Sequence, residues 1–343
     1  MTREPSYPHP GPIVRERTSR RKLLLHLVLF VMTFCTATVA GSLYPFGVNN
    51  RFPDIGADPQ TLVELGRLIL LMPMLYAAFI AAAVRDLAAN PEYLTYGLSF
   101  SLSLLFILVS HEMGHYVACR LYRVEATLPF FIPTPPLIGP AGTFGAFIRI
   151  KSPLPSRKAV FDIGVAGPIA GFVALLPVAV VGVLMMQPIP PEQMPAAGSG
   201  GLVFSDPLLL RAIGAAAGID VRFAMGNPFY FAAWLGLLVT ALNLIPAGQL
   251  DGGHAVYAVL GEKAHYFTGR IAFVVMALFS VAGMYFYGSP SGFLFVVILA
   301  LMLKIGHPRP WDESPLDAKR KLVALLTLLI FILSFTPFPI QIL

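Results

Sequence analysis

Long apolar stretches constrain the fold of this chain more than any other feature. They recur at about 23–43, 62–84, 96–119, 159–186, 228–247, 268–287, 291–305 and 321–338. Most approach the roughly 20 residues that a helix needs to cross a bilayer. Hydrophobic residues make up 56% of the 343 residues and charged residues only 12%, which is too apolar for a soluble domain of this length. The sequence therefore predicts an all-α polytopic membrane protein with about 7–8 transmembrane segments.

Two segments depart from this pattern. Residues 1–22 are Pro-rich and carry six basic residues, which predicts a disordered basic tail at a membrane surface. Residues 127–152 contain too much Pro and Gly for a long helix, and 143–150 combine small, aromatic and β-branched residues. We therefore expect a membrane-associated β-hairpin in this second segment.

The charges of the loops predict which side of the membrane each loop faces. Residues 120–158 carry six basic residues and one acidic residue, whereas 187–226 carry two basic and three acidic residues. Basic loops face the cytoplasm, so we expect 120–158 on the cytoplasmic side. If both 23–43 and 62–84 cross the membrane before the third run, the basic tail lies outside the cytoplasm. Either 62–84 is therefore a re-entrant segment, or the tail does not follow the rule for basic residues. The positive net charge is thus explained by loops that face the cytoplasm, and we expect no nucleic acid partner.

The stretch HEMGH at 111–115 places ionisable side chains inside an apolar run. On a helix, His111 and His115 lie on the same face, so both imidazoles can bind one zinc ion while Glu112 acts as a general base. The alternative is two buried structural histidines, which is costly within a bilayer.

A catalytic zinc needs a third protein ligand, and charged candidates are few. Asp251 follows an apolar run that Pro and Gly interrupt, and Gly252 and Gly253 allow an unwound backbone beside it. Asp251 is therefore our predicted ligand, although an N-cap role suits it as well. His254 is the second candidate, and Glu125 the third.

These motifs resemble the site-2 protease family of intramembrane zinc metalloproteases. HEMGH in an apolar helix is followed by NLIPAGQLDG at 243–252, which fits the family pattern NxxPxxxxDG. FDIGVAGPIAGF at 161–172 is similar to the family's Gly-rich helix, where we expect the glycines to permit close helix contact. The resemblance covers about residues 96–260.

The resemblance implies an enzyme with the following site. His111, His115 and Asp251 hold Zn²⁺, and Glu112 activates a water molecule on the metal. The enzyme hydrolyses a peptide bond in or near a transmembrane helix, with its active site toward the cytoplasm. Asn243 is similar to a family residue that contacts the substrate backbone, although a hydrogen bond between helices explains it equally well.

The resemblance also predicts the organisation of the chain. We expect N-terminal membrane segments at 23–95, the metalloprotease core at 96–260 and C-terminal membrane segments at 261–343. No stretch is long enough for a PDZ domain. The expected partners are the lipid bilayer and a single-span membrane-protein substrate, in a bacterial inner membrane. The oligomeric state stays open.

A helical substrate must become extended before it is cut, and its freed backbone groups then need hydrogen-bond partners. We expect the strand at 143–150 to accept the substrate as an added strand, with Thr143, Phe144, Gly145 and Ala146 as its substrate-binding residues. The alternative is a hairpin that only plugs the mouth of the active site.

A second class of function is a membrane transporter with a metal or proton site, because transporters also place His, Glu and Asp on helices broken by Gly and Pro. Transporters usually show internal repeats, and neither motif has a second copy in this sequence.

Overall fold

The computed structural model describes residues 19–49, 61–137, 140–190 and 202–342, and helices dominate this part of the chain. The helices are α1 (Arg20–Ser42), α2 (Leu62–Ala89), α3 (Pro91–Leu121), α4 (Arg157–Leu184), α5 (Leu208–Ala217), α6 (Pro228–Asn243), α7 (Asp251–Leu260), α8 (Glu262–Tyr287), α9 (Ser291–Met302) and α10 (Ala318–Ser334). The strands are β1 (Phe130–Pro133), β2 (Thr143–Phe147), β3 (Gln187–Pro188), β4 (Leu202–Phe204), β5 (Ala224–Met225) and β6 (Ile340–Ile342). They pair as three antiparallel two-stranded sheets within the described residues, β1 with β2, β3 with β5 and β4 with β6.

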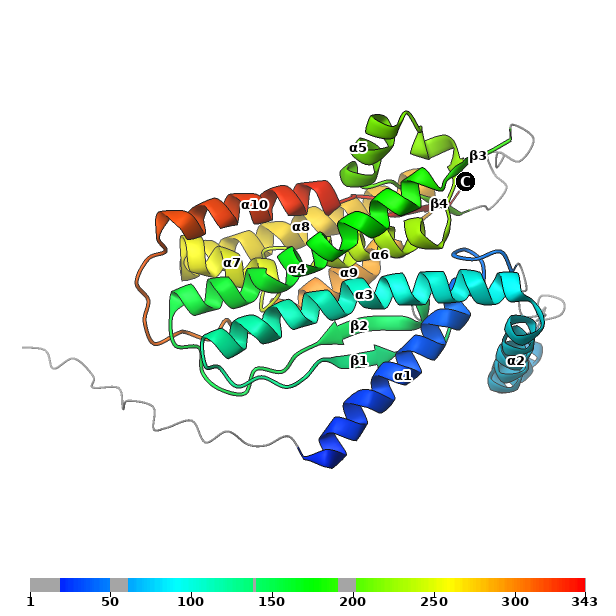
Figure 1. Ribbon diagram of the computed structural model, residues 1–343, viewed down its shortest axis with the longest axis horizontal. Coiled ribbons are helices and arrows are strands. Elements are labelled where there is room, and N and C mark those ends of the chain that lie inside the picture. The colour runs from blue at the N-terminus through cyan, green and yellow to red at the C-terminus, as the bar shows by residue number, and fades with distance from the viewer. Residues whose placement is uncertain (1–18, 50–60, 138–139, 191–201, 343) are drawn as a thin grey trace, which may run out of the picture.

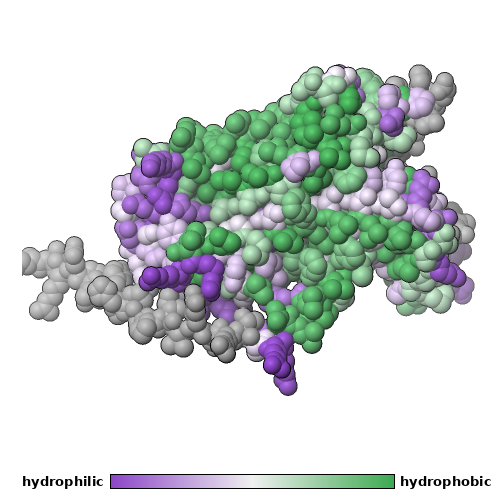
Figure 2. Space-filling model, in the orientation of Figure 1, coloured by the Kyte–Doolittle hydropathy of each residue, from purple (hydrophilic) through white to green (hydrophobic). Residues whose placement is uncertain are grey.

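The protein is a multi-pass membrane protein. Five described helices, α1, α2, α3, α4 and α8, are long and apolar enough to cross a bilayer. This is fewer than the 7–8 segments expected from the sequence, because three of the predicted apolar runs form the shorter helices α6, α9 and α10, of 16, 12 and 17 residues. Figure 2 shows a broad hydrophobic belt with hydrophilic residues gathered at the two ends. The described chain thus combines membrane-length helices with shorter apolar ones.

The central core lies between α3, α4 and α6. Phe100 and Leu104 of α3, Leu175 of α4, and Trp234 and Leu237 of α6 are all at most 2% exposed. Figure 1 shows α3 and α4 running side by side along the long axis of the molecule. This packing fixes the two helices that carry and flank the histidine motif.

Side-chain caps mark where several helices begin. Thr61 and Glu64 form a reciprocal capping box at the start of α2. Ser156, Asn227 and Asp317 accept backbone N–H bonds at the starts of α4, α6 and α10. These caps satisfy N–H groups that the first turn of a helix leaves unpaired.

Helix α2 is continuous through Pro73 and does not reverse as a re-entrant segment would. Figure 1 shows it nearly end-on beside the start of α3, whereas α3 itself lies along the long axis. Of the predicted basic tail, residues 1–18 lie outside the described residues, and residues 20–22 already belong to α1.

The predicted β-hairpin is present. Phe130 pairs with Phe147, and a bulge separates this part of the ladder from the Pro133–Thr143 pair. Helix α1 supports the hairpin, because Nδ1 of His26 donates a hydrogen bond to the Pro129 carbonyl at 3.0 Å. The hairpin and α1 are therefore tied together along one side of α3 (Figure 1).

The backbone around Asp251 differs from the predicted unwound segment. Helix α6 ends at Asn243, a tight turn follows, and α7 starts at Asp251, so Gly252 and Gly253 are helical. These glycines allow close packing instead, since a Cβ on Gly252 would lie 2.0 Å from the Leu244 carbonyl oxygen. The turn and the close contact together fix the place of Asp251.

Candidate metal centre

Helix α3 places the histidine motif on its buried side. His111, Glu112 and His115 are 4%, 6% and 7% exposed, although each is ionisable. Such burial is costly unless the groups bind partners or a metal ion. The motif lies where α3 packs against α4, so the position of α4 determines the space around the imidazoles.

Asp251 completes a group of three metal-binding side chains with His111 and His115. Its Oδ2 atom lies 3.3 Å from Nε2 of each histidine, and the two Nε2 atoms are 3.1 Å apart. Zn–N distances of about 2.0–2.1 Å in a tetrahedral site place neighbouring ligand atoms roughly 3.3 Å apart. The observed spacing therefore fits zinc, and the carboxylate–imidazole donor set is one that zinc prefers.

The backbone of α4 orients His115. The Ile163 carbonyl accepts a hydrogen bond from Nδ1 of His115 at 2.7 Å, which leaves Nε2 as the nitrogen with a free lone pair. Gly167 faces the same ring, and a Cβ there would lie only 2.0 Å from Nε2. The predicted close helix contact at the glycines is thus a contact with the metal ligands themselves.

Glu112 faces the same space as the ligands. Its carboxylate lies beside the backbone N–H of Ile148, which follows strand β2. Glu112, both histidines and Asp251 line one cavity of about 640 Å³. A general base that lines the same cavity as a metal site is the arrangement that metal-assisted hydrolysis requires.

The predicted substrate-binding residues lie at different distances from this cavity. Asn243 and Ala146 line it, and the Asn243 amide nitrogen is 3.4 Å from Nε2 of His111. Thr143, Phe144 and Gly145 are not among the lining residues.

Thr143 has a local task in the hairpin. Its hydroxyl donates to the Ile132 carbonyl and accepts a hydrogen bond from the Gly145 N–H. Gly145 itself has a φ of +93°, a conformation that L side chains rarely adopt. These two residues therefore hold the bulge of the hairpin.

The two lower-ranked ligand candidates are not part of the metal group. His254 lines the cavity, but its Nδ1 is bonded to His307 at 2.7 Å. Glu125 lies in the loop after α3, where its backbone N–H donates to the Ser152 hydroxyl. The ranking of Asp251 above both thus agrees with the geometry.

Sequence reasoning missed two parts of the cavity wall. Residues 151–154, beyond the predicted strand at 143–150, line it, and so does Pro308 from the link between α9 and α10. Nothing in the sequence connected Pro308 with a motif about 200 residues earlier in the chain.

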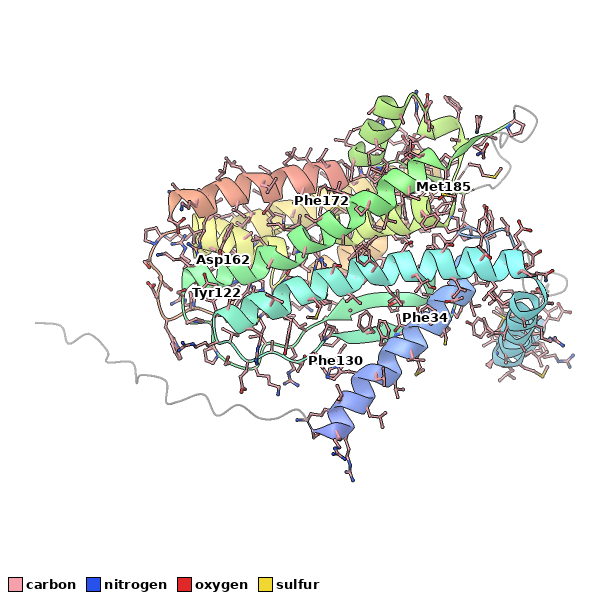
Figure 3. All side chains as sticks on the ribbon, in the orientation of Figure 1. Phe34, Tyr122, Phe130, Asp162, Phe172 and Met185 are labelled. Atoms are coloured by element: carbon pink, nitrogen blue, oxygen red, sulfur yellow. The ribbon has the colours of Figure 1, made fainter. Side chains whose placement is uncertain are left out.

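A polar cluster holds the nearby ends of α3, α4 and α10 together. Figure 3 shows Tyr122 and Asp162 near each other at the ends of α3 and α4. The Tyr122 hydroxyl donates to Asp162 at 2.5 Å, and the Arg320 guanidinium donates to both Asp162 carboxylate oxygens at 2.9 and 2.6 Å. Bidentate pairs of this kind fix geometry as well as adding stability. The cluster lies one to two helical turns from the ligands and stabilises this end of the bundle.

A two-histidine, one-aspartate metal site with an adjacent glutamate, set in a membrane-length helix, defines a membrane metalloprotease class. The family model "Peptidase family M50" matches residues 99–284, more than half of the chain. The chain therefore belongs to peptidase family M50, which confirms the resemblance to site-2 proteases that the motifs indicated.

Known relatives agree with this assignment. The chain is 31% identical over 281 residues to "Probable zinc metalloprotease EGY1, chloroplastic" of Arabidopsis thaliana, covering 80% of this chain and 45% of that protein. It is 28% identical over 297 residues to "Probable zinc metalloprotease EGY2, chloroplastic" of the same plant, covering 84% and 50%. The chain spans about half the length of the curated relatives it matches. No solved structure matches it significantly.

Proposed function

We propose that this protein is an intramembrane zinc metalloprotease that hydrolyses a peptide bond in or near a transmembrane helix of another membrane protein. The observation that carries the proposal is the convergence of His111, His115 and Asp251 beside Glu112 in one cavity. Membership of family M50 supports a protease over the transporter alternative.

The residues of the chain divide the chemistry between them. When bound, zinc would polarise the scissile carbonyl group and make water a competent nucleophile near neutral pH. His111, His115 and Asp251 would hold the ion. Glu112 takes a proton from the attacking water and delivers it to the leaving amine.

The segment after β2 is the proposed docking edge for an extended substrate. Arg149 and Lys151 direct their backbone groups away from the cavity, because the Arg149 carbonyl accepts from Thr127 and the Lys151 N–H donates to Glu125. Backbone groups alternate along a strand, so those of Ile148 point the opposite way, toward the active site. Residues 146–150 are the part of the predicted strand that lines this cavity, so we narrow the docking edge to them.

The active site faces the cytoplasm in this proposal. Loop 120–158, which follows the histidine motif, has the strongest basic excess of the charged loops. The start of α1 lies beside this loop, because Nδ1 of His26 donates a hydrogen bond to the Pro129 carbonyl. The basic residues at the start of α1 then share the cytoplasmic side with loop 120–158. Location in a bacterial inner membrane stays a prediction.

The deciding experiment reconstitutes the purified protein with single-span membrane peptides of varied sequence. Fragments are identified by mass spectrometry, in parallel with Glu112→Gln. We expect cleavage within or next to the membrane-spanning segment, with one zinc ion per chain in both proteins. Cleavage of soluble peptides alone, or equal cleavage by Glu112→Gln, would contradict the proposal.

A further inference from the structure

A segment between α9 and α10 crosses the active-site end of the bundle. This strap, residues 303–317, is fixed at one side where Arg309 donates to both carboxylate oxygens of Glu262 at 2.8 and 3.0 Å. It is fixed at the other side where the Arg157 N–H donates to the Asp312 carbonyl at 2.7 Å. The strap therefore links α8 to the start of α4 next to the proposed active site.

His307 is the residue through which the strap reaches the cavity wall. Its Nε2 lies 2.7 Å from Nδ1 of His254, and its Nδ1 lies 2.8 Å from the Pro308 carbonyl oxygen. Its ring stacks on Tyr257, with centroids 3.9 Å apart and planes 9° apart. Contacts on the ring face and at both nitrogens hold this imidazole in one orientation.

These contacts determine where the protons of the histidine pair reside. A carbonyl oxygen only accepts, so Nδ1 of His307 carries a hydrogen. Burial lowers the pKa of His307 to about 3, so the ring is neutral at physiological pH and its Nε2 is an acceptor. Nδ1 of His254 must then be the donor in the 2.7 Å contact. The remaining nitrogen of His254, Nε2, consequently has a free lone pair.

That lone pair is open to the cavity. His254 lines the cavity, and Nε2 has no hydrogen-bond partner among the described residues. Among the described residues, three buried side-chain atoms lack a hydrogen-bond partner, and Nε2 of His254 is not one of them. Because Nε2 has no partner, it must therefore be accessible. On its other side the His254 side chain rests on Gly164, where an added Cβ would lie 2.7 Å from His254 Cβ. His254, on α7 and packed against α4, thus presents Nε2 as a hydrogen-bond acceptor to a molecule in the cavity.

An extended substrate has two edges, and both need hydrogen-bond partners in a site shielded from water. The edge beside Ile148 finds them on the segment after β2. The other edge faces the wall built by α4 and α7, where His254 offers an acceptor. We propose that Nε2 of His254 binds a backbone N–H of the substrate on this second edge, and that His307 is a positioning residue that fixes its tautomer. This inference rests on the proposed protease function.

The test removes single N–H donors from the substrate. A cleavable membrane peptide is prepared with an ester in place of one backbone amide at each position around the scissile bond. With the unmodified protein, we expect one ester position away from the scissile bond to lower kcat/KM about 3- to 10-fold, the value of one net hydrogen bond. In His254→Ala, that same ester should have no further effect, because the two changes remove one interaction.

Matched variants separate this role from a structural one. His254→Gln carries an acceptor at the end of its side chain and should keep part of the ester sensitivity. His254→Asn keeps only a donor toward His307 and should lose it. His307→Phe preserves the stacking on Tyr257 but removes the acceptor that fixes the tautomer of His254, so it should also reduce the ester sensitivity. His265→Gln changes a neighbouring histidine that does not line the cavity and should keep the full sensitivity.

The outcomes distinguish this inference from the proposed function. If the unmodified protein cleaves no membrane peptide, the protease proposal and this inference both fail. If it cleaves and His254→Ala retains the ester sensitivity, only this inference fails. Loss of zinc in His254→Ala would assign the residue to the metal site and overturn its role in substrate binding. Should His254→Ala not fold, equal ester sensitivity in His254→Gln and His254→Asn would overturn the inference.

Discussion

Gly167 of α4 lies so close to His115 of α3 that an added Cβ would sit 2.0 Å from Nε2 of the imidazole. No side chain can occupy that space while His115 keeps its orientation toward Asp251. The absence of a side chain at residue 167 is therefore a requirement of the metal site. The contact that packs α4 against α3 at this point therefore also fixes the position of a metal ligand.

Gly167→Ala should weaken zinc binding by about 10- to 100-fold, the range seen when groups that orient a ligand are altered. The added methyl group pushes the His115 ring away from the other two ligands. Zinc per chain after dialysis against a graded chelator measures the effect. Gly171→Ala is the matched control, since its Cβ would lie 3.0 Å from His111 Cβ and needs only a small shift. Equal zinc affinity in the two variants would contradict the argument.

Glu112→Gln should lower kcat by about 10²- to 10⁴-fold, the usual contribution of a general base. The amide keeps the shape of the side chain but cannot take a proton from water. Zinc content and membrane insertion should match the unmodified protein, because Glu112 is not one of the three ligands. Near-normal turnover would remove the assigned role.

Asp251→Asn should reduce zinc content, whereas His254→Ala should leave it nearly intact. Oδ2 of Asp251 lies 3.3 Å from both imidazole Nε2 atoms, whereas His254 is outside the metal group. Metal analysis of the two purified variants measures the difference. The reverse order of zinc loss would make His254 the third ligand.

Ala146→Pro should sharply reduce cleavage of a helical membrane substrate and should spare zinc content. Proline removes a backbone N–H on the proposed docking edge. A substrate already loosened by Gly and Pro should be affected less, because it needs less help to become extended. Phe144→Pro, at a 58% exposed residue that does not line the cavity, should have the smaller effect. Equal loss on both substrates would count against strand addition.

The sequence by itself determined the local chemistry. The spacing of His111 and His115 places both on one helix face whatever surrounds them, and long apolar runs predict membrane helices because the bilayer has a fixed thickness. The hairpin was predictable because Pro and Gly exclude a helix there. The Gly-rich motif was correctly predicted as a site of close helix contact.

Only the tertiary structure decided which distant parts of the chain share the site. The sequence predicted 7–8 crossings because an apolar run carries no mark of where its helix stops, as α6 and α9 show. Gly252 and Gly253 suggested an unwound backbone, but close packing against the preceding turn keeps them helical. His307 reaches the cavity wall through a strap whose position depends on contacts with α8 and α4. Such long-range contacts follow from packing in three dimensions, which a local pattern of residues does not encode.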